Sequence, residues 1–460
     1  MRSQPGTPPS APLTSVSHAQ PRLQGRVLIL TSGLGFGHVR AAQAIEAAFL
    51  QRQVAVRVVD LWSLINSGAV SIIHQTYLQL VQEYPTLYER LYQLDERTWR
   101  QILESESGPP PDVMEVLELI SQIASNSVAE SGGAQYPTDR LLLSMLYTSL
   151  PYDRTSLGGN GIRARLALIK WSWLRMRKRL ITMASGFAPD LIISTQMIPA
   201  AMIASLRDRQ MSMPHIGVPT DYGVHDFWRQ PGIDRYCIAH ESVIPDDASD
   251  HSRLVTTGVP LMAAFSQPLS QREARAQLRL HPDRKMVLIL GGGLGLSVDA
   301  IAGRLLEGAA EATLVVMPGR NAVARSALTR QLSAAPGRLQ ICSWTDRMDI
   351  YMRAADVVVG KPGGVSVAEV LACGRPLFAT RSLGGQEGFN VRFLEQHGVG
   401  ALVRDEDLAA RIERAISDPR GLADMQQRAW ELGKRDGAAS VAELGLDLMA
   451  SQRRTARGLQ

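Results

Sequence analysis

The chain contains two series of short apolar strands alternating with helices, and a glycine-rich loop opens each series. The first series begins with an expected strand at Gly25–Thr31 and the loop Ser32–His38. The second begins with a strand at Lys285–Leu290 and the loop Gly291–Gly295. Such alternation is typical of parallel sheets, which bind ligands at the carboxyl ends of their strands. The sequence therefore predicts an α/β fold with two parallel-sheet domains facing each other across a cleft.

Both series continue as short β-branched runs separated by helix-length spacers. Further strands are expected at Gln53–Asp60, Asp190–Thr195, His215–Pro219, Arg235–Ala239, Ala312–Met317, Leu339–Cys342, Asp356–Gly360 and Pro376–Thr380. A length of 460 residues is enough for two domains with a core each. We expect a disordered leader at 1–24, an N-terminal domain at 25–260 with an insertion at about 105–161, a C-terminal domain at 261–450 and a tail at 451–460.

Composition limits the class of protein. No apolar run approaches the ~18–20 residues that a membrane-spanning helix needs. The leader is rich in Pro, Ser, Gln and Thr and lacks the apolar segment of a signal peptide. Cys237, Cys342 and Cys373 show no metal-binding spacing, which predicts reduced, mostly buried thiols and no metal site. These features indicate a cytoplasmic globular protein.

The segment Gly360–Ser366 is the clearest candidate for a ligand site, because a Pro-Gly-Gly turn here joins a buried strand to a helix. Amides at a helix N-terminus and the positive end of its dipole suit a diphosphate, which Gly363, Gly364 and Ser366 would approach and Lys361 would partly neutralise. Glu369 lies on the same helical face and suits the hydroxyls of a ribose. The alternative is an ordinary glycine turn followed by a solvated or capping carboxylate.

The first glycine loop places His38 after Gly35 and Gly37, where a dinucleotide fingerprint would require a third glycine. A histidine at the start of a helix facing the cleft can take the proton of an attacking hydroxyl, since it titrates near neutral pH. Asp60 ends the second strand, where a dinucleotide-binding domain carries its ribose-binding acid. A purely structural His38, bonded to a backbone group, is the other alternative.

Polar clusters also follow other strands of both series. Asp221 and His225 should open toward the same cleft as His38, with Trp228 as a flat apolar wall, unless the two polar residues only cap their loop. In the second series the candidates for contacts with a nucleotide and its sugar are Gly293, Gly319, Arg320, Met348, Gln386, Glu387 and Asn390.

One helix is strongly basic. No acidic residue lies between Asp153 and Asp190, whereas the expected helix from Ile162 to Leu180 carries an apolar stripe beside basic side chains. This pattern suits an anionic membrane surface, and no nucleic-acid motif accompanies it. The alternative is that the stripe packs on the domain core. The side chains expected at the membrane are Trp171, Trp173, Arg175 and Arg177.

Taken together, these motifs resemble the monogalactosyldiacylglycerol synthase and processive diacylglycerol glucosyltransferase family, which is related to the lipid II N-acetylglucosaminyltransferase. The resemblance runs from about Gly25 to Val403 and is most specific in GKPGGVSVAEVLACGRP followed by GGQEGFN. The loop ending at His38, the segment TDYGVHDFW and TTGVP also correspond. Plant-type members have an acid where this chain has Gly33, and some bacterial members have one where it has Phe389.

The resemblance implies a GT-B fold of two Rossmann-like domains and a cytoplasmic enzyme attached peripherally to the inner face of the cell membrane. Such an enzyme transfers a hexose with inversion from a UDP-sugar to a diacylglycerol-type lipid, without a cofactor. By this resemblance, Glu369 binds the ribose, and the diphosphate lies against Gly363, Gly364 and Ser366. The donor sugar is bound by Gln386, Glu387 and Asn390. His38 is the base, and Asp221 and His225 lie near the acceptor. A UDP-sugar epimerase of the same architecture and an NAD-dependent oxidoreductase are the alternatives.

Overall fold

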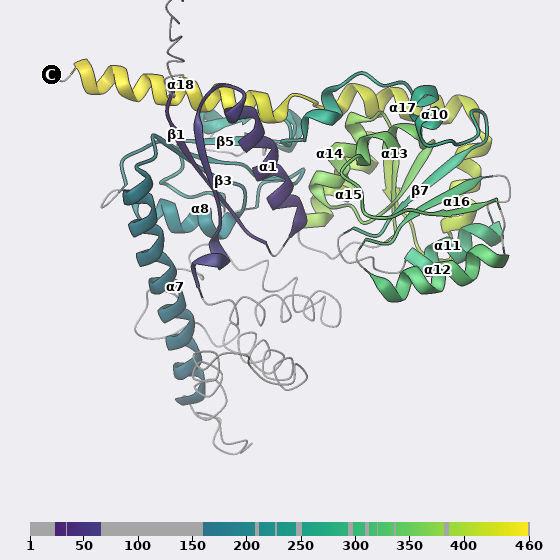
Figure 1. Cartoon of the computed structure of the whole chain (residues 1–460), viewed down its shortest axis with the longest axis horizontal. Helices are drawn as coiled ribbons and strands as arrows, with labels where there is room; N and C mark the ends of the chain where they lie inside the picture. Colours follow the sequence, from purple (N-terminus) through teal and green to yellow (C-terminus); the bar gives the residue numbers. More distant parts are fainter. Residues whose placement is uncertain are drawn as a thin grey trace, which may run out of the picture.

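The computed structural model describes residues 24–33, 35–65, 160–207, 211–225, 228–244, 251–292, 298–308, 312–319, 321–334, 337–380 and 386–458, with the backbone alone for 160–172, 332–334 and 456–458. The predicted leader and insertion lie almost wholly outside these residues. Figure 1 shows two lobes side by side, each a sheet flanked by helices. The first lobe is defined here as the sheet β1–β6 with its covering helices, and the second lobe as the sheet β7–β12 with its own.

The first lobe is built on a six-stranded, all-parallel sheet in the order β2-β1-β3-β4-β5-β6. Its strands are β1 (Arg26–Thr31), β2 (Ala55–Asp60), β3 (Leu191–Ser194), β4 (His215–Gly217), β5 (Arg235–Ile238) and β6 (Leu254–Thr256). Its helices are α1 (Phe36–Leu50), α7 (Asn160–Phe187) and α8 (Met197–Ala204), with short 3-10 turns η1 (Leu61–Leu64), η3 (Glu241–Val243) and η4 (His251–Arg253).

The second lobe repeats this plan in the order β12-β11-β10-β7-β8-β9, again all parallel. Its strands are β7 (Met286–Leu290), β8 (Thr313–Met317), β9 (Leu339–Ile341), β10 (Val357–Gly360), β11 (Leu377–Ala379) and β12 (Gly400–Leu402). Its helices are η5 (Ala263–Ser266), α10 (Gln271–Gln277), α11 (Val298–Gly308), α12 (Ala322–Ala334), α13 (Met348–Ala354), α14 (Gly364–Ala372), α15 (Gln386–Gln396), α16 (Leu408–Ser417) and α17 (Pro419–Leu432).

Strand order fixes where a ligand can bind. In each sheet the chain starts at an interior strand, and later strands add to both sides of it: β2 and β3 beside β1, and β8 and β10 beside β7. The loop after such a central strand lies at the point where the order reverses, and the crevice outside the carboxyl ends of parallel strands opens there. The loop before α1 and the Pro-Gly-Gly loop after β10 both lie at these points. The fold therefore places both predicted motifs at crevices.

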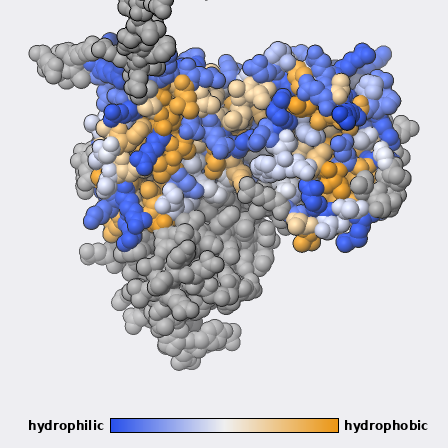
Figure 2. All heavy atoms as spheres, viewed as in Figure 1, coloured by the Kyte–Doolittle hydropathy of each residue, from blue (hydrophilic) through white to orange (hydrophobic). Residues whose placement is uncertain are grey.

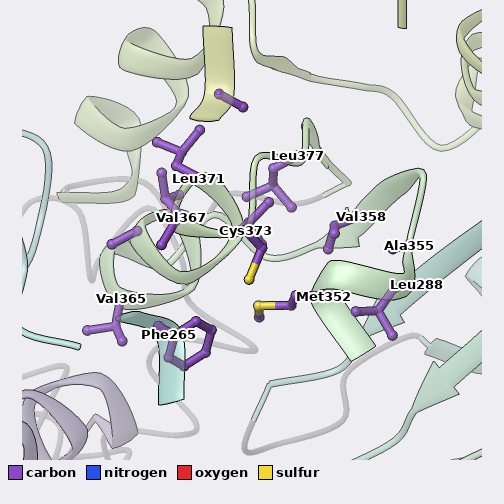
Figure 3. Close-up of a cluster of buried hydrophobic side chains, with 14 of the residues drawn as sticks. Phe265, Leu288, Met352, Ala355, Val358, Val365, Val367, Leu371, Cys373 and Leu377 are labelled. Atoms are coloured by element: carbon purple, nitrogen blue, oxygen red, sulfur yellow. The ribbon is translucent and has the colours of Figure 1, made fainter. Parts of the chain in front are cut away.

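Each sheet is buried on both faces, as the near-continuous apolar strands require. Along β1 successive side chains alternate between two cores, with Val27 and Ile29 in one and Leu28 and Leu30 in the other. Figure 3 shows the core that lies between β7, β10 and α14, with Cys373 among its apolar side chains. All three cysteines are buried free thiols, as the sequence predicts.

The last described helix, α18 (Gly437–Gly458), leaves the second lobe and covers the first, as Figure 1 shows at its top. Val441, Ala442 and Met449 join the core on one face of the first sheet. Arg453 pairs with Asp190 at 3.3 Å, just before β3. The structure thus completes the first lobe with residues that the predicted bounds of 25–260 leave out, and those bounds stay a prediction.

The predicted α/β, two-sheet fold is confirmed by the two parallel sheets. The structure adds β6 and β12, which were not predicted as strands, and it starts α1 at Phe36, so that His38 lies inside the first turn. In the described half of α7, Met176 and Leu180 are buried in the first lobe and Trp173 packs against the same core. The described part of the apolar stripe therefore packs on the core, as the second of the two alternatives expects, and the rest of the stripe lies outside the described side chains.

None of the helices in the described ranges is both long enough and apolar enough to cross a membrane. In the view of Figure 2, hydrophilic and hydrophobic residues are interspersed over both lobes.

Candidate active site

Two helix N-termini meet between the lobes. α1 begins after Gly35 and α14 begins after Gly363, and neither glycine supplies a side chain to cap its helix. The helices touch here, since a Cβ added to Gly37 would lie 3.2 Å from the Val365 methyl group. The first amides of each helix lack intrahelical partners, and the dipoles add positive potential. The meeting point of α1 and α14 therefore favours an anion.

The two glycines of the Pro-Gly-Gly loop have different surroundings. No atom lies within 4 Å of the position that a Cβ on Gly363 would occupy. A Cβ on Gly364 would lie 2.7 Å from Asp221 Oδ1 in the loop after β4. Gly364 thus lets the two lobes approach, whereas the open side at Gly363 leaves room for a ligand beside unpaired amides. Ser366, in the first turn of α14, is partly exposed on the same helix.

Glu369 lies further along α14 and is partly exposed. Burial raises the pKa of its carboxyl to about 7, with the positive charge of Arg40 opposing that shift and the negative charge of Asp349 adding to it. Within the described residues its carboxylate makes no hydrogen bond, so both oxygens remain available as acceptors. Hydroxyl donors from a ligand would favour the ionised form and lower this pKa.

His38 lies in the first turn of α1, with Nδ1 2.8 Å from the carbonyl oxygen of Thr195 and 3.3 Å from Thr220 Oγ1. A carbonyl can only accept, so Nδ1 carries the proton and the lone pair of the neutral ring lies on Nε2. Burial lowers the pKa of His38, and the charge of Asp221 and the bond to Thr195 oppose this effect. The ring is therefore neutral at pH 7 with Nε2 as its basic atom.

Asp221 is held by the opposite lobe. Asn390 Nδ2 in α15 donates to Asp221 Oδ1 at 2.8 Å and to the Pro362 carbonyl oxygen at 2.9 Å, and its Oδ1 accepts from the Tyr222 amide at 2.7 Å. The Asn390 side chain is fully buried. In this structure its amide bonds protein groups on both lobes and is not exposed to the cleft, in contrast to the sugar contact expected from the sequence.

Lys361 and Glu387 form an ion pair with 2.7 Å between Nζ and Oε1. The Glu387 side chain is 6% exposed and that of Lys361 is 39% exposed, so the lysine neutralises a nearly buried carboxylate and still reaches solvent. An ammonium group has three donors, which leaves capacity for a phosphate oxygen. Gln386, the first residue of α15, is partly exposed beside this pair.

The structure does not bring every candidate to the cleft. Trp228 is 6% exposed and packs with Ile233, Tyr236 and Ile238, so it belongs to a core and not to an exposed apolar wall. His225 is partly exposed in the loop after β4. Gly319 follows β8 with φ 61°, which favours glycine, and Met348 opens α13. Gly293, Arg320 and the side chain of Trp171 lie outside the described residues.

Sequence reasoning missed three contributors to the site. Thr195 and Thr220 hold the imidazole of His38. Thr195 ends one predicted strand and Thr220 follows another, a signal that could have found them. Arg40 reaches across from α1, with its NH1 3.9 Å from Asp346 Oδ1 and its charge acting on Glu369. No local pattern predicts this role of Arg40, because Asp346 and Glu369 belong to the other lobe.

Asp60, considered for an NAD site, is engaged elsewhere. Its Oδ1 accepts from the Trp62 amide at 3.1 Å and caps η1, and the carboxylate lies directly against Gly33. Among the described side chains, no group of three or more metal-ligating residues occurs. The geometry thus offers an anion site at two helix ends, a neutral imidazole beside it, and carboxylates from both lobes.

Comparisons with known proteins agree with this arrangement. The family model of monogalactosyldiacylglycerol (MGDG) synthase matches residues 161–261, and that of the glycosyltransferase family 28 C-terminal domain matches residues 286–443. The second match includes the Pro-Gly-Gly loop, Glu369 and Asn390, whereas His38 precedes both matches.

The chain is also similar to curated relatives. It is 28% identical to the processive diacylglycerol beta-glucosyltransferase of Bacillus licheniformis over 55% of this chain and 68% of that protein. The protein of the same description from Bacillus mycoides is 22% identical over 91% of this chain and 92% of its own length.

Solved structures share the fold. MurG of Acinetobacter baumannii superposes with a TM-score of 0.55 at 14% identity, covering 92% of this chain and 99% of that one. The UDP-GlcNAc 2-epimerase of Neisseria meningitidis gives 0.50 at 11% identity, covering 92% and 100%. At such identities the likeness shows the two-lobed fold alone.

Proposed function

Because the chain is a glycosyltransferase related to the monogalactosyldiacylglycerol synthases and the processive diacylglycerol beta-glucosyltransferases, we propose that it transfers a hexose from a UDP-sugar to the hydroxyl of a diacylglycerol-type lipid. The observation that carries the proposal is the meeting of the uncapped N-termini of α1 and α14 beside the neutral imidazole of His38.

In this proposal the second lobe binds the donor. The amides at Gly363, Gly364 and Ser366 and the ammonium group of Lys361 hold the diphosphate, since the space at Gly363 is open and the helix end is positive. Glu369 accepts hydrogen bonds from the ribose with its two unbonded oxygens. Gln386 and Glu387 lie at the start of α15, where they can contact the sugar.

The first lobe presents the acceptor. Nε2 of His38 takes the proton of the lipid hydroxyl while its oxygen attacks the anomeric carbon from the face opposite UDP. The bond from that carbon to the phosphate oxygen breaks, and UDP leaves with the electron pair, so the configuration inverts. The amides of α14 stabilise the charge that develops on the departing diphosphate, and Asp221 stabilises the imidazolium. Alignment of the two substrates lowers the barrier further.

We also propose that the exposed basic side of α7 attaches the protein to an anionic membrane surface, at the inner face of the cell membrane where UDP-sugars are available. Arg175 and Lys178 are exposed on this helix beside Leu174, which is 57% exposed. Basic side chains near an anionic surface contribute about 1 kcal/mol each. Trp173, packed against the core, is not part of this surface.

A transfer assay tests the proposal. The protein is incubated with UDP-glucose, UDP-galactose or UDP-N-acetylglucosamine, with and without vesicles containing diacylglycerol, and the products are identified by mass spectrometry. We expect a glycosylated lipid and vesicle-dependent release of UDP. Interconversion of free UDP-sugars without lipid would contradict transfer and favour the epimerase alternative.

The same assay tests His38. The substitution His38→Ala should lower kcat by about a hundredfold or more, because a general base contributes on that order. Affinity for UDP, measured by calorimetry, should stay within about twofold, since the helix amides hold the diphosphate. The exposed His251→Gln serves as a control with unchanged turnover. Wild-type turnover in His38→Ala would remove the imidazole from the mechanism.

A further inference from the structure

Asn390 occupies a junction between the lobes. It lies on α15 of the second lobe and is fully buried, yet its partners Asp221 and Tyr222 belong to the loop after β4 of the first lobe. Its third partner is the carbonyl oxygen of Pro362, in the Pro-Gly-Gly loop. One amide therefore bonds to the acceptor-side loop and the donor-side loop together.

The bonding capacity of this amide is mostly used. A carboxamide has two N–H donors, and both are engaged, one by Asp221 Oδ1 and one by Pro362. Its oxygen accepts from the backbone of Tyr222. A sugar hydroxyl would have to displace these bonds in a buried site, where an unpaired polar group is costly.

The neighbouring residues fit the loop after β4 closely against α14 and α15. Gly364 leaves no room for a side chain beside Asp221, and the ring of Phe389 lies directly against Gly223. The rings of Tyr222 and Phe393 are 4.2 Å apart between centroids. Asp221 is thus placed by groups of the second lobe as much as by its own backbone.

Asp221 in turn faces His38. Among the described residues, the Thr195 carbonyl and the Thr220 hydroxyl lie within hydrogen-bond distance of this imidazole, and the charge of the Asp221 carboxylate acts on it. Of these only Asp221 carries a charge that can stabilise an imidazolium. Its position relative to His38 depends on the contact that Asn390 makes from the other lobe.

We propose that Asn390 is a positioning residue, which fixes the carboxylate of Asp221 beside His38 so that the base is fully assembled only while the two lobes are closed. This inference rests on the proposed role of His38. It assigns Asn390 to the assembly of the base and not to the binding of the donor sugar.

A double-mutant cycle on the transfer reaction tests the proposal. Asn390→Ala should lower kcat on the order of tenfold to a hundredfold, as expected for a displaced catalytic group, with KM for the UDP-sugar within about twofold. Asp221→Asn keeps an oxygen that accepts from Asn390 but removes the charge. Adding Asn390→Ala to Asp221→Asn should lower kcat by less than about threefold, because both changes act through one group. Effects that multiply, or a large rise in KM for the donor, would overturn the proposal.

An NMR measurement that needs no transfer activity tests this inference independently of the proposed function. In NMR titrations of the histidine rings, Asn390→Ala should lower the pKa of His38, because Asp221 no longer opposes the effect of burial. An unchanged titration of His38 would contradict the positioning role whether or not the wild-type protein transfers sugar. Absence of lipid transfer by the wild-type protein would instead contradict the proposed function alone.

Two further variants control for stability. If Asn390→Ala does not fold, Asn390→Ser keeps a polar group at the site but is too short to reach Asp221, and the same outcomes apply. Ser242→Ala removes a different contact between the lobes, the one from Ser242 Oγ to His397 Nε2 at 3.3 Å. At pH 7.5 it should leave kcat unchanged, since it does not touch Asp221 and the bonds of Asn390 still join the lobes. If Ser242→Ala and Asn390→Ala lowered kcat equally, Asn390 would act only as one of several contacts between the lobes, and the proposal would be refuted.

Discussion

At the scale of single residues, burial shifts Glu369 and His38 in opposite directions for the same reason. Removal from water disfavours the charged form, so the pKa of the carboxyl rises and that of the imidazole falls. Near pH 7 the site therefore holds a neutral base and a carboxyl that is close to half protonated. Both groups become more easily charged when a ligand supplies hydrogen bonds or a counter-charge.

The raised pKa of Glu369 predicts how the stability of the Glu369→Gln variant depends on pH. The folded pKa of about 7 lies above the ordinary value of 4.5. The folded state therefore has its full stability at low pH, and the buried charge of Glu369 lowers the free energy of unfolding as the pH rises through about 7. The glutamine variant should unfold at an equal or higher temperature than the wild type at pH 8, and the difference should shrink toward pH 5. Thermal unfolding followed by circular dichroism measures this.

The affinity of the same variant for UDP should fall, in contrast to its stability at pH 8. Glu369→Gln should weaken UDP binding by about tenfold or more, since a hydrogen bond to a charged group contributes roughly 1.5–3 kcal/mol. Calorimetry with UDP provides the measurement, and Glu443→Gln, at an exposed position on α18, is a matched control. A large fall in unfolding temperature at pH 8 would instead show that Glu369 has a structural role.

At the scale of elements, the residues of α7 that pack on the first lobe are distinct from its exposed basic residues. Met176 and Leu180 pack on the first lobe, and Arg179 donates to the Leu64 carbonyl oxygen at 2.7 Å, so these residues hold the helix. Arg175 and Lys178 are exposed. A helix attached along one side in this way can present its basic side to a membrane without rearranging.

The exposed face of α7 can be tested without disturbing its packing. Arg175→Glu with Lys178→Glu should release the protein from vesicles of anionic lipid, because about 1 kcal/mol of attraction per basic side chain becomes repulsion. Vesicle co-sedimentation measures the bound fraction. Arg414→Glu with Arg420→Glu on the second lobe is the matched control. Equal sedimentation of the wild type and the α7 variant would exclude this face as the attachment site.

The strands and loops of this protein differ in how clearly the sequence predicts them. Long apolar strands such as Arg26–Thr31 and Thr313–Met317 can be predicted from the sequence because every residue after the first is buried and apolar or β-branched. β6 and β12 are edge strands of three residues each, formed by pairing with β5 and β11, and their own pattern is too short to reveal them. The Pro-Gly-Gly loop was predictable from local chemistry, whereas the bond from Asn390 to Asp221 depends on how two distant lobes pack.

At the scale of the whole molecule, a second contact between the lobes contains two histidines. His240 follows β5, His397 follows α15, and Ser242 Oγ lies 2.9 Å from His240 Nδ1 and 3.3 Å from His397 Nε2. Burial lowers the pKa of both rings, and Lys434 and the neighbouring ring lower that of His240 further, while Glu241 opposes these effects. The junction therefore favours neutral rings.

This junction predicts that the lobes separate in acid. In the folded protein the pKa values of His240 and His397 both lie below the ordinary value of 6.5. The contact between the lobes therefore has its full stability above that pH and loses it as the pH falls and the rings become charged. Small-angle scattering should show a larger radius of gyration at pH 5.5 than at pH 7.5. His397→Gln, which keeps a hydrogen-bonding group without the charge, should reduce the change, and His251→Gln should not. A wild-type radius independent of pH would refute the prediction.

The path of α18 has a consequence for how the protein is made. Val441, Ala442 and Met449 complete a core whose other members begin with Val27, so this core is incomplete while Met449 is still inside the ribosome. The strands of the second lobe all emerge before that moment. Although domains generally mature in the order of their synthesis, here the lobe translated first finishes last, and its uncovered apolar face is what a nascent-chain chaperone would hold.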